Sequence, residues 1–207
     1  MTSQPQQIHP NPNRTAIYEW IAARTPEGAR VIDIGCGDGT LLALLAERKR
    51  TRGSGIELSQ ELVHQAILRG LSVYHGNVDE GLVAYGDNSF DLAILSLTIQ
   101  ELGDPLNVIE EALRVGRRAV VVFPNFANWR SRWQLAVHGH APDTPSLPHK
   151  WFESPNRHYL SVLDWEEFVE HARWRIVEKS FVAKGREVVS WPNLFSELAM
   201  YLIEKED

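Results

Sequence analysis

Three glycines and two carboxylates follow a short apolar run near the start of the chain, and together they have the residue types of a ligand site. The segment spans residues 31–39 and reads V-I-D-I-G-C-G-D-G. Glycine permits positive φ angles and lets a ligand approach the bare backbone. A helix that begins directly after such a loop also presents N–H groups without backbone partners. The segment therefore predicts a strand, a ligand-binding turn and a helix, in that order.

The spacing of the glycines separates this loop from the general dinucleotide-binding pattern. That pattern, G-x-G-x-x-G, has a third glycine for close helix packing, and Thr40 occupies the corresponding position here. The order D-x-G-x-G-x-G, formed by Asp33, Gly35, Gly37 and Gly39, instead resembles the S-adenosylmethionine loop of class I methyltransferases. The resemblance implies S-adenosylmethionine or S-adenosylhomocysteine as the cofactor. Carboxylates suit the positive sulfonium of S-adenosylmethionine, and no P-loop lysine follows the glycines.

Polar residues at later strand ends extend the same resemblance. Glu57 ends the second predicted strand, where an acid can accept hydrogen bonds from both ribose hydroxyls, although taken alone it could also be a solvated acid. Residues 76–79 resemble the segment that meets the adenine, and that contact could come from Asn77 or from Asp79. Ser96 directly follows the fourth predicted strand, at its carboxyl end, and ligands of open parallel sheets bind outside such ends. The predicted cofactor-binding residues are Asp33, Gly35, Cys36, Gly37, Gly39, Glu57, Leu58, Asn77, Val78, Asp79 and Ser96.

Side chains suited to catalysis are scarce. Cys36 could be a nucleophile, but no histidine is beside it in the sequence, and a small side chain simply fits in the loop. Gln100 occupies a place where many small-molecule methyltransferases carry histidine, and Glu101 could be a base or a solvated acid at a helix start. Methyl transfer can run largely on the alignment of donor and acceptor. No catalytic residue is therefore assigned.

Alternating apolar patterns place these residues on a sheet. Strands are predicted at residues 30–34, 54–57, 72–75, 90–95 and 119–123, with helices after residue 40 and at 60–68 and 106–113. This alternation implies βαβ units and a parallel sheet with right-handed crossovers. A helix at 163–171, a strand at 174–183 and a final inserted strand within 195–203 follow. We expect an α/β fold with a doubly wound, mostly parallel seven-stranded sheet, of the Rossmann-like class I methyltransferase type.

The chain is expected to form one domain with two additions. Residues 1–13 are polar and contain three prolines, which predicts a mobile N-terminal arm before a methyltransferase-like domain at 14–207. Residues 126–160 lack periodicity and contain four prolines, which predicts an irregular insert after the fifth strand. Its tryptophans favour an ordered structure, and its four cations against two acids make it locally basic. Four histidines also lie there, but no Cys pair or closely spaced acid completes a metal site, and no metal is predicted.

Composition argues against several function classes. The chain has 207 residues, a formal net charge of −6 and one cysteine. This acidic balance argues against a basic face spread over phosphates, so no nucleic-acid partner is expected. No apolar run approaches the ~18 residues of a membrane span, and the first residues lack an apolar signal core. We expect a cytoplasmic protein without membrane association and without an internal disulfide.

Several longer segments carry a more specific signal. They are L-S-L-T-I-Q at 95–100, L-R-V-G-R-R at 113–118, F-P-N-F-A-N-W-R at 123–130, L-P-H-K-W-F at 147–152 and S-P-N-R-H at 154–158. These segments resemble the MetW family of methionine biosynthesis proteins. The resemblance implies a protein that binds S-adenosylmethionine and assists or regulates a partner, homoserine O-acyltransferase. A methyltransferase that acts on a small metabolite is the alternative.

The last predicted set comprises residues that could contact a substrate or the protein partner. Most of them belong to the basic, tryptophan-containing insert. They are Gln100, Asn125, Trp129, Arg130, His149, Trp151 and His158.

Overall fold

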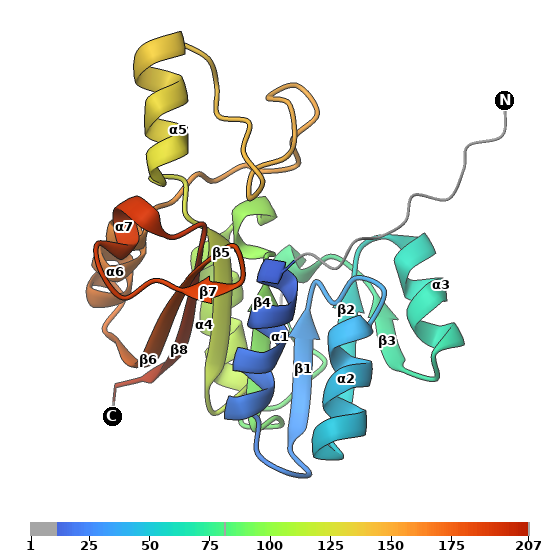
Figure 1. Ribbon diagram of the computed structural model, residues 1–207. Coiled ribbons are helices and arrows are strands. Elements are labelled where there is room, and N and C mark those ends of the chain that lie inside the picture. Colours follow the sequence, from blue (N-terminus) through green and yellow to red (C-terminus); the bar gives the residue numbers. More distant parts are fainter. Residues whose placement is uncertain (1–11, 81, 207) are drawn as a thin grey trace, which may run out of the picture.

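The computed structural model describes residues 12–80 and 82–206 (Figure 1). The predicted mobile arm, residues 1–13, lies outside the described residues except for Pro12 and Asn13. These two residues begin helix α1, Pro12–Arg24. Proline suits the first turn of a helix, because the N–H group that it lacks would have no partner there.

The described strands form one eight-stranded sheet in the order β3-β2-β1-β4-β5-β8-β6-β7. Their bounds are β1 Arg30–Ile34, β2 Arg52–Glu57, β3 Ser72–His75, β4 Leu92–Ser96, β5 Ala119–Pro124, β6 Trp174–Ala183, β7 Arg186–Glu187 and β8 Leu198–Lys205. Strands β1 to β5 run parallel, and β8 is inserted between β5 and β6, antiparallel to both. The predicted α/β fold with a mostly parallel sheet and a final inserted strand is therefore confirmed.

Strand β7 is an addition to the seven predicted strands. It pairs only Arg186 and Glu187 with the end of β6. Lys184 and Gly185 connect the two strands with positive φ angles of 51° and 74°. Two such residues in succession form the tight hairpin turn whose twist matches that of the flanking strands. A strand of two residues has too little alternation to be recognised in the sequence.

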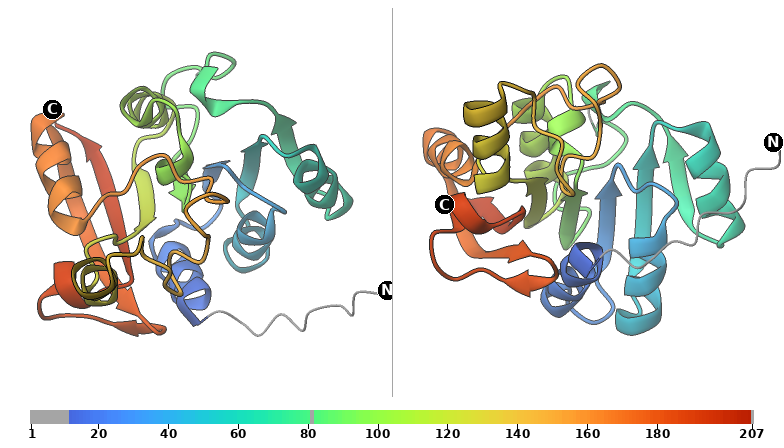
Figure 2. Two further views of the ribbon diagram at one scale, coloured as in Figure 1. Left: turned by 90° about the horizontal axis from the view of Figure 1, so that it is seen from above. Right: turned by 45° about the horizontal axis from the view of Figure 1, so that its top comes forward.

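Helices cover both faces of the sheet (Figure 2). Besides α1, the described helices are α2 Thr40–Lys49, α3 Gln60–Leu68, η1 Val78–Glu80, η2 Ile99–Glu101, α4 Pro105–Val115, α5 Trp129–Trp133, η3 Gln134–His138, α6 Val162–His171 and α7 Pro192–Phe195. Val120 and Val122 of β5 pack in one core with α1 and α2, while Val121 and Phe123 pack in the other with α4 and α6. The strand is therefore apolar at every position, because it is buried on both faces. No helix in the described ranges is long and apolar enough to cross a membrane.

The insert after β5 contains a helix, so the expectation of an irregular segment is wrong for residues 129–138. Helix α5 continues into the π-helix η3, and together they rise above the strand ends (Figure 1). The Asn128 side chain accepts a hydrogen bond from the Arg130 N–H at the start, and Gly139 ends the helix with a φ of 64°. These are ordinary helix-capping signals. The prolines that suggested irregularity begin only at Pro142.

The carboxyl ends of β1, β4 and β5 meet at one edge of the sheet, and this edge positions the site (Figure 1). The glycine loop follows β1, helix η2 follows β4 and the insert follows β5. The start of α1 is fixed beside this edge, because the Asn13 amide donates to Glu197 at 2.8 Å and accepts from the Gly185 N–H at 2.7 Å. Segments from distant parts of the chain therefore converge outside the strand ends, where ligands of such sheets bind.

Candidate ligand-binding site

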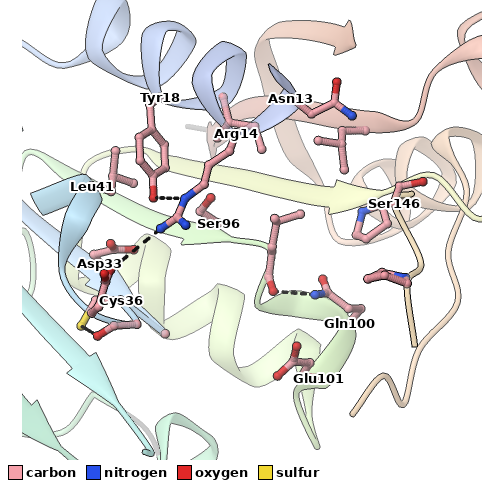
Figure 3. A pocket seen from close by; sticks show the side chains of 18 of the residues that line it. Asn13, Arg14, Tyr18, Asp33, Cys36, Leu41, Ser96, Gln100, Glu101 and Ser146 are labelled. Atoms are coloured by element: carbon pink, nitrogen blue, oxygen red, sulfur yellow. Dashed lines mark hydrogen bonds and ion pairs between the residues drawn. The ribbon is translucent and has the colours of Figure 1, made fainter. Parts of the chain in front are cut away.

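A cavity of about 590 Å³ lies at the carboxyl edge of the sheet (Figure 3). Its walls come from α1, the glycine loop, the start of α3, the end of β4 with η2, and residues 145–149 of the insert. The predicted cofactor residues that line it are Asp33, Gly35, Cys36, Gly37 and Ser96. Two of the predicted substrate or partner contacts, Gln100 and His149, line it as well. The sequence motifs and the cavity therefore both place the candidate ligand site at the carboxyl edge of the sheet.

The three loop glycines have different physical roles. An ideal Cβ added at Gly35 would lie 2.6 Å from Thr98 Oγ1, and one added at Gly39 would collide with the Leu71 side chain. Those two positions are therefore restricted by packing inside the protein. Gly37 differs, because its φ is +57° and an added Cβ would meet no atom within 4 Å. Its bare backbone borders open space, as a residue approached by a ligand requires.

Asp33 places a buried carboxylate in the cavity wall. Its side chain is only 2% exposed, and its Oδ1 has no hydrogen-bond partner within the described chain. Burial, with a contribution from the Glu57 charge, raises the pKa of Asp33 to about 7. An isolated buried carboxylate is costly unless a positive group or a donor approaches it. The wall therefore suits a cationic ligand.

Glu57 supports the loop from the neighbouring strand. Its Oε2 accepts a hydrogen bond from the Gly37 N–H at 2.9 Å, and its Oε1 accepts one from the Ser59 N–H at 2.8 Å. The half-buried carboxylate thus joins the glycine loop to the start of α3. Glu57 itself is not among the residues that line the cavity. Its contact with a ribose remains a prediction.

The remaining predicted cofactor residues lie outside the cavity wall. They are Gly39, Leu58, Asn77, Val78 and Asp79. The Asp79 carboxylate accepts hydrogen bonds from the backbone of Gly103 at 3.0 Å and of Asp104 at 3.3 Å, and so supports the start of α4. Asn77 is exposed, and its Oδ1 accepts from the Asp79 N–H at 3.1 Å. The Asp79 carboxylate already accepts these backbone hydrogen bonds, so Asn77 is the more available of the two alternatives for the adenine contact.

Helix α1 supplies site residues that the sequence reasoning missed. Arg14 and Tyr18 both line the cavity, and the Arg14 Nε donates to the Tyr18 hydroxyl at 2.8 Å (Figure 3). The Arg14 guanidinium also lies 3.9 Å from the Asp38 carboxylate. Burial alone would raise the pKa of Asp38, but hydrogen bonds from Thr40 and the nearby arginines outweigh it and lower that pKa. The i, i+4 spacing of Arg14 and Tyr18 could have indicated that the two side chains lie on one face of a helix. The sequence did not show which edge of the sheet that helix covers.

The loop cysteine has the properties of a packing residue. Burial, together with the Asp33 and Glu57 charges, raises the pKa of Cys36 to about 12. The thiol is therefore neutral at physiological pH, whereas the thiolate is the nucleophile in cysteine chemistry. An added Cβ at Gly55 would lie 2.5 Å from the Cys36 sulfur, which shows how closely β2 packs against it. The interpretation of Cys36 as a small fitting side chain agrees with this geometry.

The insert closes the far side of the cavity next to η2. Gln100 is buried, its Oε1 has no partner among the described residues, and its backbone oxygen accepts from the N–H groups of Arg157 and His158. The His158 ring is engaged with the Leu102 carbonyl at 3.0 Å. Burial and the Glu57 charge raise the pKa of Glu101, while His149 lowers it. Polar groups of η2 and the insert could therefore receive a second ligand.

Four other predicted contacts lie in the insert or directly before it, and their environments differ. Asn125 is fully buried, so its prediction as a substrate or partner contact is wrong. Its side-chain nitrogen lies within 3.3 Å of the carbonyl oxygens of α7 and the following turn, which ties β5 to β8. Arg130 pairs with the buried Glu197 at 3.0 Å, and Trp129 and Trp151 are exposed.

No three His, Cys, Asp or Glu side chains of the described ranges come together as a metal site.

We expect the substitution Asn125→Ala to lower the free energy of unfolding by about 2–4 kcal/mol, because it leaves buried carbonyl groups without a donor. Urea denaturation measures the change. The exposed Asn107 on α4 is the matched control, and Asn107→Ala should change that free energy by less than about 0.5 kcal/mol. An equally small effect of Asn125→Ala would contradict the structural role.

Comparison with known proteins identifies the family. The family described as "MetW: Methionine biosynthesis protein MetW" matches residues 14–203. The chain belongs to the MetW family. It is 32% identical, over 98% of its length, to the bifunctional methionine biosynthesis protein MetXA/MetW of Rhodopirellula baltica. The chain spans about a third (34%) of that MetW relative. A demethylmenaquinone methyltransferase of Listeria monocytogenes is 24% identical over 74% of this chain and 73% of its own.

Solved structures show that this MetW-family chain has the methyltransferase fold. One is the complex between the Haloferax volcanii Trm112 methyltransferase activator and the putative methyltransferase, with a TM-score of 0.69, 18% identity, and 94% and 91% of the two chains covered. Another is an S-adenosylmethionine-dependent methyltransferase from Mesorhizobium loti, with a TM-score of 0.69, 16% identity, and 94% and 100% covered. At such identities the likeness concerns the fold, and a fold does not fix a reaction.

Proposed function

We propose that this MetW-family protein binds S-adenosylmethionine in the cavity and assists or regulates a homoserine O-acyltransferase of methionine biosynthesis. The observation that carries the ligand is the buried Asp33 carboxylate, whose Oδ1 has no hydrogen-bond partner among residues 12–80 and 82–206 and which lines the cavity together with Gly37. A cationic nucleoside with an amino-acid moiety matches this combination of groups.

The residues around the cavity fit such a ligand by their chemistry. Asp33 would face positive charge, and the Arg14 guanidinium would face the amino-acid carboxylate. The Gly37 backbone and the Glu57 carboxylate adjoin one another and would border the ribose, with Asn77 next to the adenine. When bound, S-adenosylmethionine supplies an activated methyl group. The chain's own residues would bind and orient the ligand.

Two observations support a role beside an acyltransferase rather than methyl transfer alone. First, the relative from Rhodopirellula baltica carries MetXA and MetW in one polypeptide, of which this chain matches a third. Second, the Cys36 thiol in the cavity wall is held in its neutral form, which does not suit it as a nucleophile. A regulatory ligand must have different affinities for two states of the protein or of its complex. S-adenosylmethionine is a product of the pathway that the acyltransferase feeds, so it suits that regulation.

Calorimetric titration tests the ligand part of the proposal. Both S-adenosylmethionine and S-adenosylhomocysteine should bind the wild-type protein with a stoichiometry of one, and ATP should serve as the matched nucleotide control. ATP should bind weakly, because the cavity has carboxylates and lacks a phosphate loop. The proposed site would be refuted if neither S-adenosylmethionine nor S-adenosylhomocysteine produced a heat of binding and neither competed with the other.

A methyltransferase that acts on a small metabolite is the second candidate. It is favoured by the polar groups of η2, because the buried Gln100 oxygen has no partner in the described part of the chain and burial raises the pKa of Glu101. These groups could hold a methyl acceptor next to the donor. Formation of S-adenosylhomocysteine from S-adenosylmethionine with homoserine or an O-acylhomoserine as acceptor would support it. Tight ligand binding with no turnover of these acceptors favours the accessory role.

A further inference from the structure

The insert exposes apolar side chains that nothing in the chain covers among the described residues. Trp133, Leu135 and Val137 of α5 and η3 are all more than half exposed. Trp151 and Phe152 follow in the loop, and their rings are in edge-to-face contact at 5.6 Å. Exposed apolar side chains gathered in one segment mark an interaction site more often than isolated ones do. The segment also rises away from the sheet, where a partner can reach it (Figure 1).

Two of these side chains, Leu135 and Trp151, line an apolar groove of about 400 Å³ between η3 and the following loop. Its apolar walls include Phe126, Leu135, Pro142, Leu147, Trp151 and Tyr159. The Phe126 and Tyr159 rings are in contact at 5.0 Å and form its base with the Phe126 backbone, which donates to the Leu160 carbonyl at 3.0 Å. The walls are thus partly fixed, while the 76%-exposed Trp151 remains accessible. Such a groove has the size and character of a pocket for one large apolar side chain.

All residues that line the groove belong to the insert, and the net charge of the insert indicates the character of an occupant. The insert has four cations and two acids in a chain of net charge −6. Arg130 is paired with Glu197 outside the insert, but Arg132 and Arg157 are exposed. A complementary partner face would present an apolar anchor surrounded by carboxylates. A second copy of this acidic chain matches that description less well, because its own apolar segment is basic.

We infer that this groove is the docking site for the homoserine O-acyltransferase, which inserts an apolar side chain between Leu135 and Trp151. The inference rests on the proposed function. In the fused relative, the part that matches this chain is covalently joined to the remainder of a bifunctional protein, so the two parts are held at high effective concentration. A groove that receives an apolar anchor would hold the same two parts together through a non-covalent contact.

The groove shares a wall with the ligand cavity. His149 and Asn156 line both spaces, and Leu147 of the groove lies between Ser146 and Pro148 of the cavity. A ligand that positions this wall on one side therefore changes the shape presented on the other. Because coupling between two binding sites is reciprocal, the partner must change ligand affinity by the same factor.

Binding of the acyltransferase from the same organism to the full chain tests the docking site. Biolayer interferometry should show that Leu135→Glu and Trp151→Ala each weaken binding roughly tenfold or more. The matched control is Leu68→Ala, because Leu68 is 74% exposed and belongs to α3, which lies at the β3 end of the sheet, away from the insert (Figure 1). All three side chains are exposed, so the variants should keep the wild-type melting temperature. The wild-type affinity should also change when S-adenosylhomocysteine is present.

Each contrary result has its own meaning. Wild-type binding with unchanged affinity in both groove variants overturns the docking site and leaves the proposed function in place. No wild-type binding overturns both. Dimers of the wild-type chain that dissociate in both variants would show that a second copy covers the groove, which also overturns the inference. An affinity for the acyltransferase that S-adenosylhomocysteine leaves unchanged overturns the link across the shared wall.

Discussion

The substitution Gly37→Val should abolish binding of S-adenosylmethionine and S-adenosylhomocysteine, with a loss of at least about 100-fold in affinity. An added Cβ at this position meets no atom of the described residues within 4 Å, so the valine side chain would occupy space that the proposed ligand requires. A clash of this kind removes the close approach to the backbone that glycine alone allows. Calorimetric titration of both ligands measures the loss.

The positive φ of Gly37 complicates that experiment, because valine is strained at +57° wherever it occurs. Gly28 provides a matched control, since its φ is +70° and an added Cβ there also meets no atom within 4 Å. It lies in the turn before β1, at the opposite end of that strand from the glycine loop. Gly28→Val should cost a similar amount of stability and leave ligand affinity unchanged. Tight binding by a folded Gly37→Val variant would show that the loop assignment is wrong.

The substitution Asp33→Asn should weaken S-adenosylmethionine binding by about 10- to 100-fold, because it replaces a charge-assisted contact by a neutral one. It should also remove a pH dependence. The pKa of Asp33 is about 7 in the free protein, and a cationic ligand favours the ionised form. Wild-type affinity should therefore fall as the pH drops from 8 to 6, while the variant should vary much less. Calorimetric titrations of the wild type and the variant at four pH values measure this difference. The same pH dependence of ligand affinity in both proteins would contradict the role of Asp33.

The same carboxylate should make the free protein less stable at high pH. Its pKa is raised from 3.8 to about 7 on folding, so the folded state holds the proton more tightly than the unfolded state. Stability linked to this group is present below about pH 4 and is lost as the pH rises to 7. Asp33→Asn should therefore raise the free energy of unfolding at pH 8 by up to about 4 kcal/mol, and change it little at pH 4. Destabilisation at pH 8 would be the opposite of this result.

Local patterns predicted most of the fold, because β4 and β5 are nearly continuous apolar runs and because strand and helix patterns alternate along the chain. The bounds of β1, α3, β3 and β6 agree with those expected from the sequence. The final strand was predicted because its apolar residues near the C-terminus suit insertion into the sheet. The two-residue β7 and the helix of the insert were missed. In the insert, the caps Asn128 and Gly139 were present in the sequence, but the prolines further along dominated the interpretation.

The candidate site was predicted where the sequence has a local motif and missed where tertiary packing forms it. The glycine loop and Asp33 line the cavity as expected. Arg14 lines the cavity only because α1 lies beside the strand ends, and no local sequence pattern predicts where α1 packs. Asn125 is polar and belongs to a distinctive motif, but it is buried by α7, which is far away in the sequence. A polar residue in a motif can therefore serve the fold and not a ligand.

The rate of homoserine acylation tests the central claim most directly. The acyltransferase of the same organism would be assayed alone, with an equimolar amount of this protein, and with this protein plus S-adenosylmethionine. We predict that the protein changes the rate and that S-adenosylmethionine changes it further, while the Gly37→Val variant abolishes only the second effect. Identical rates in all three assays, at micromolar concentrations of both proteins, would contradict the account.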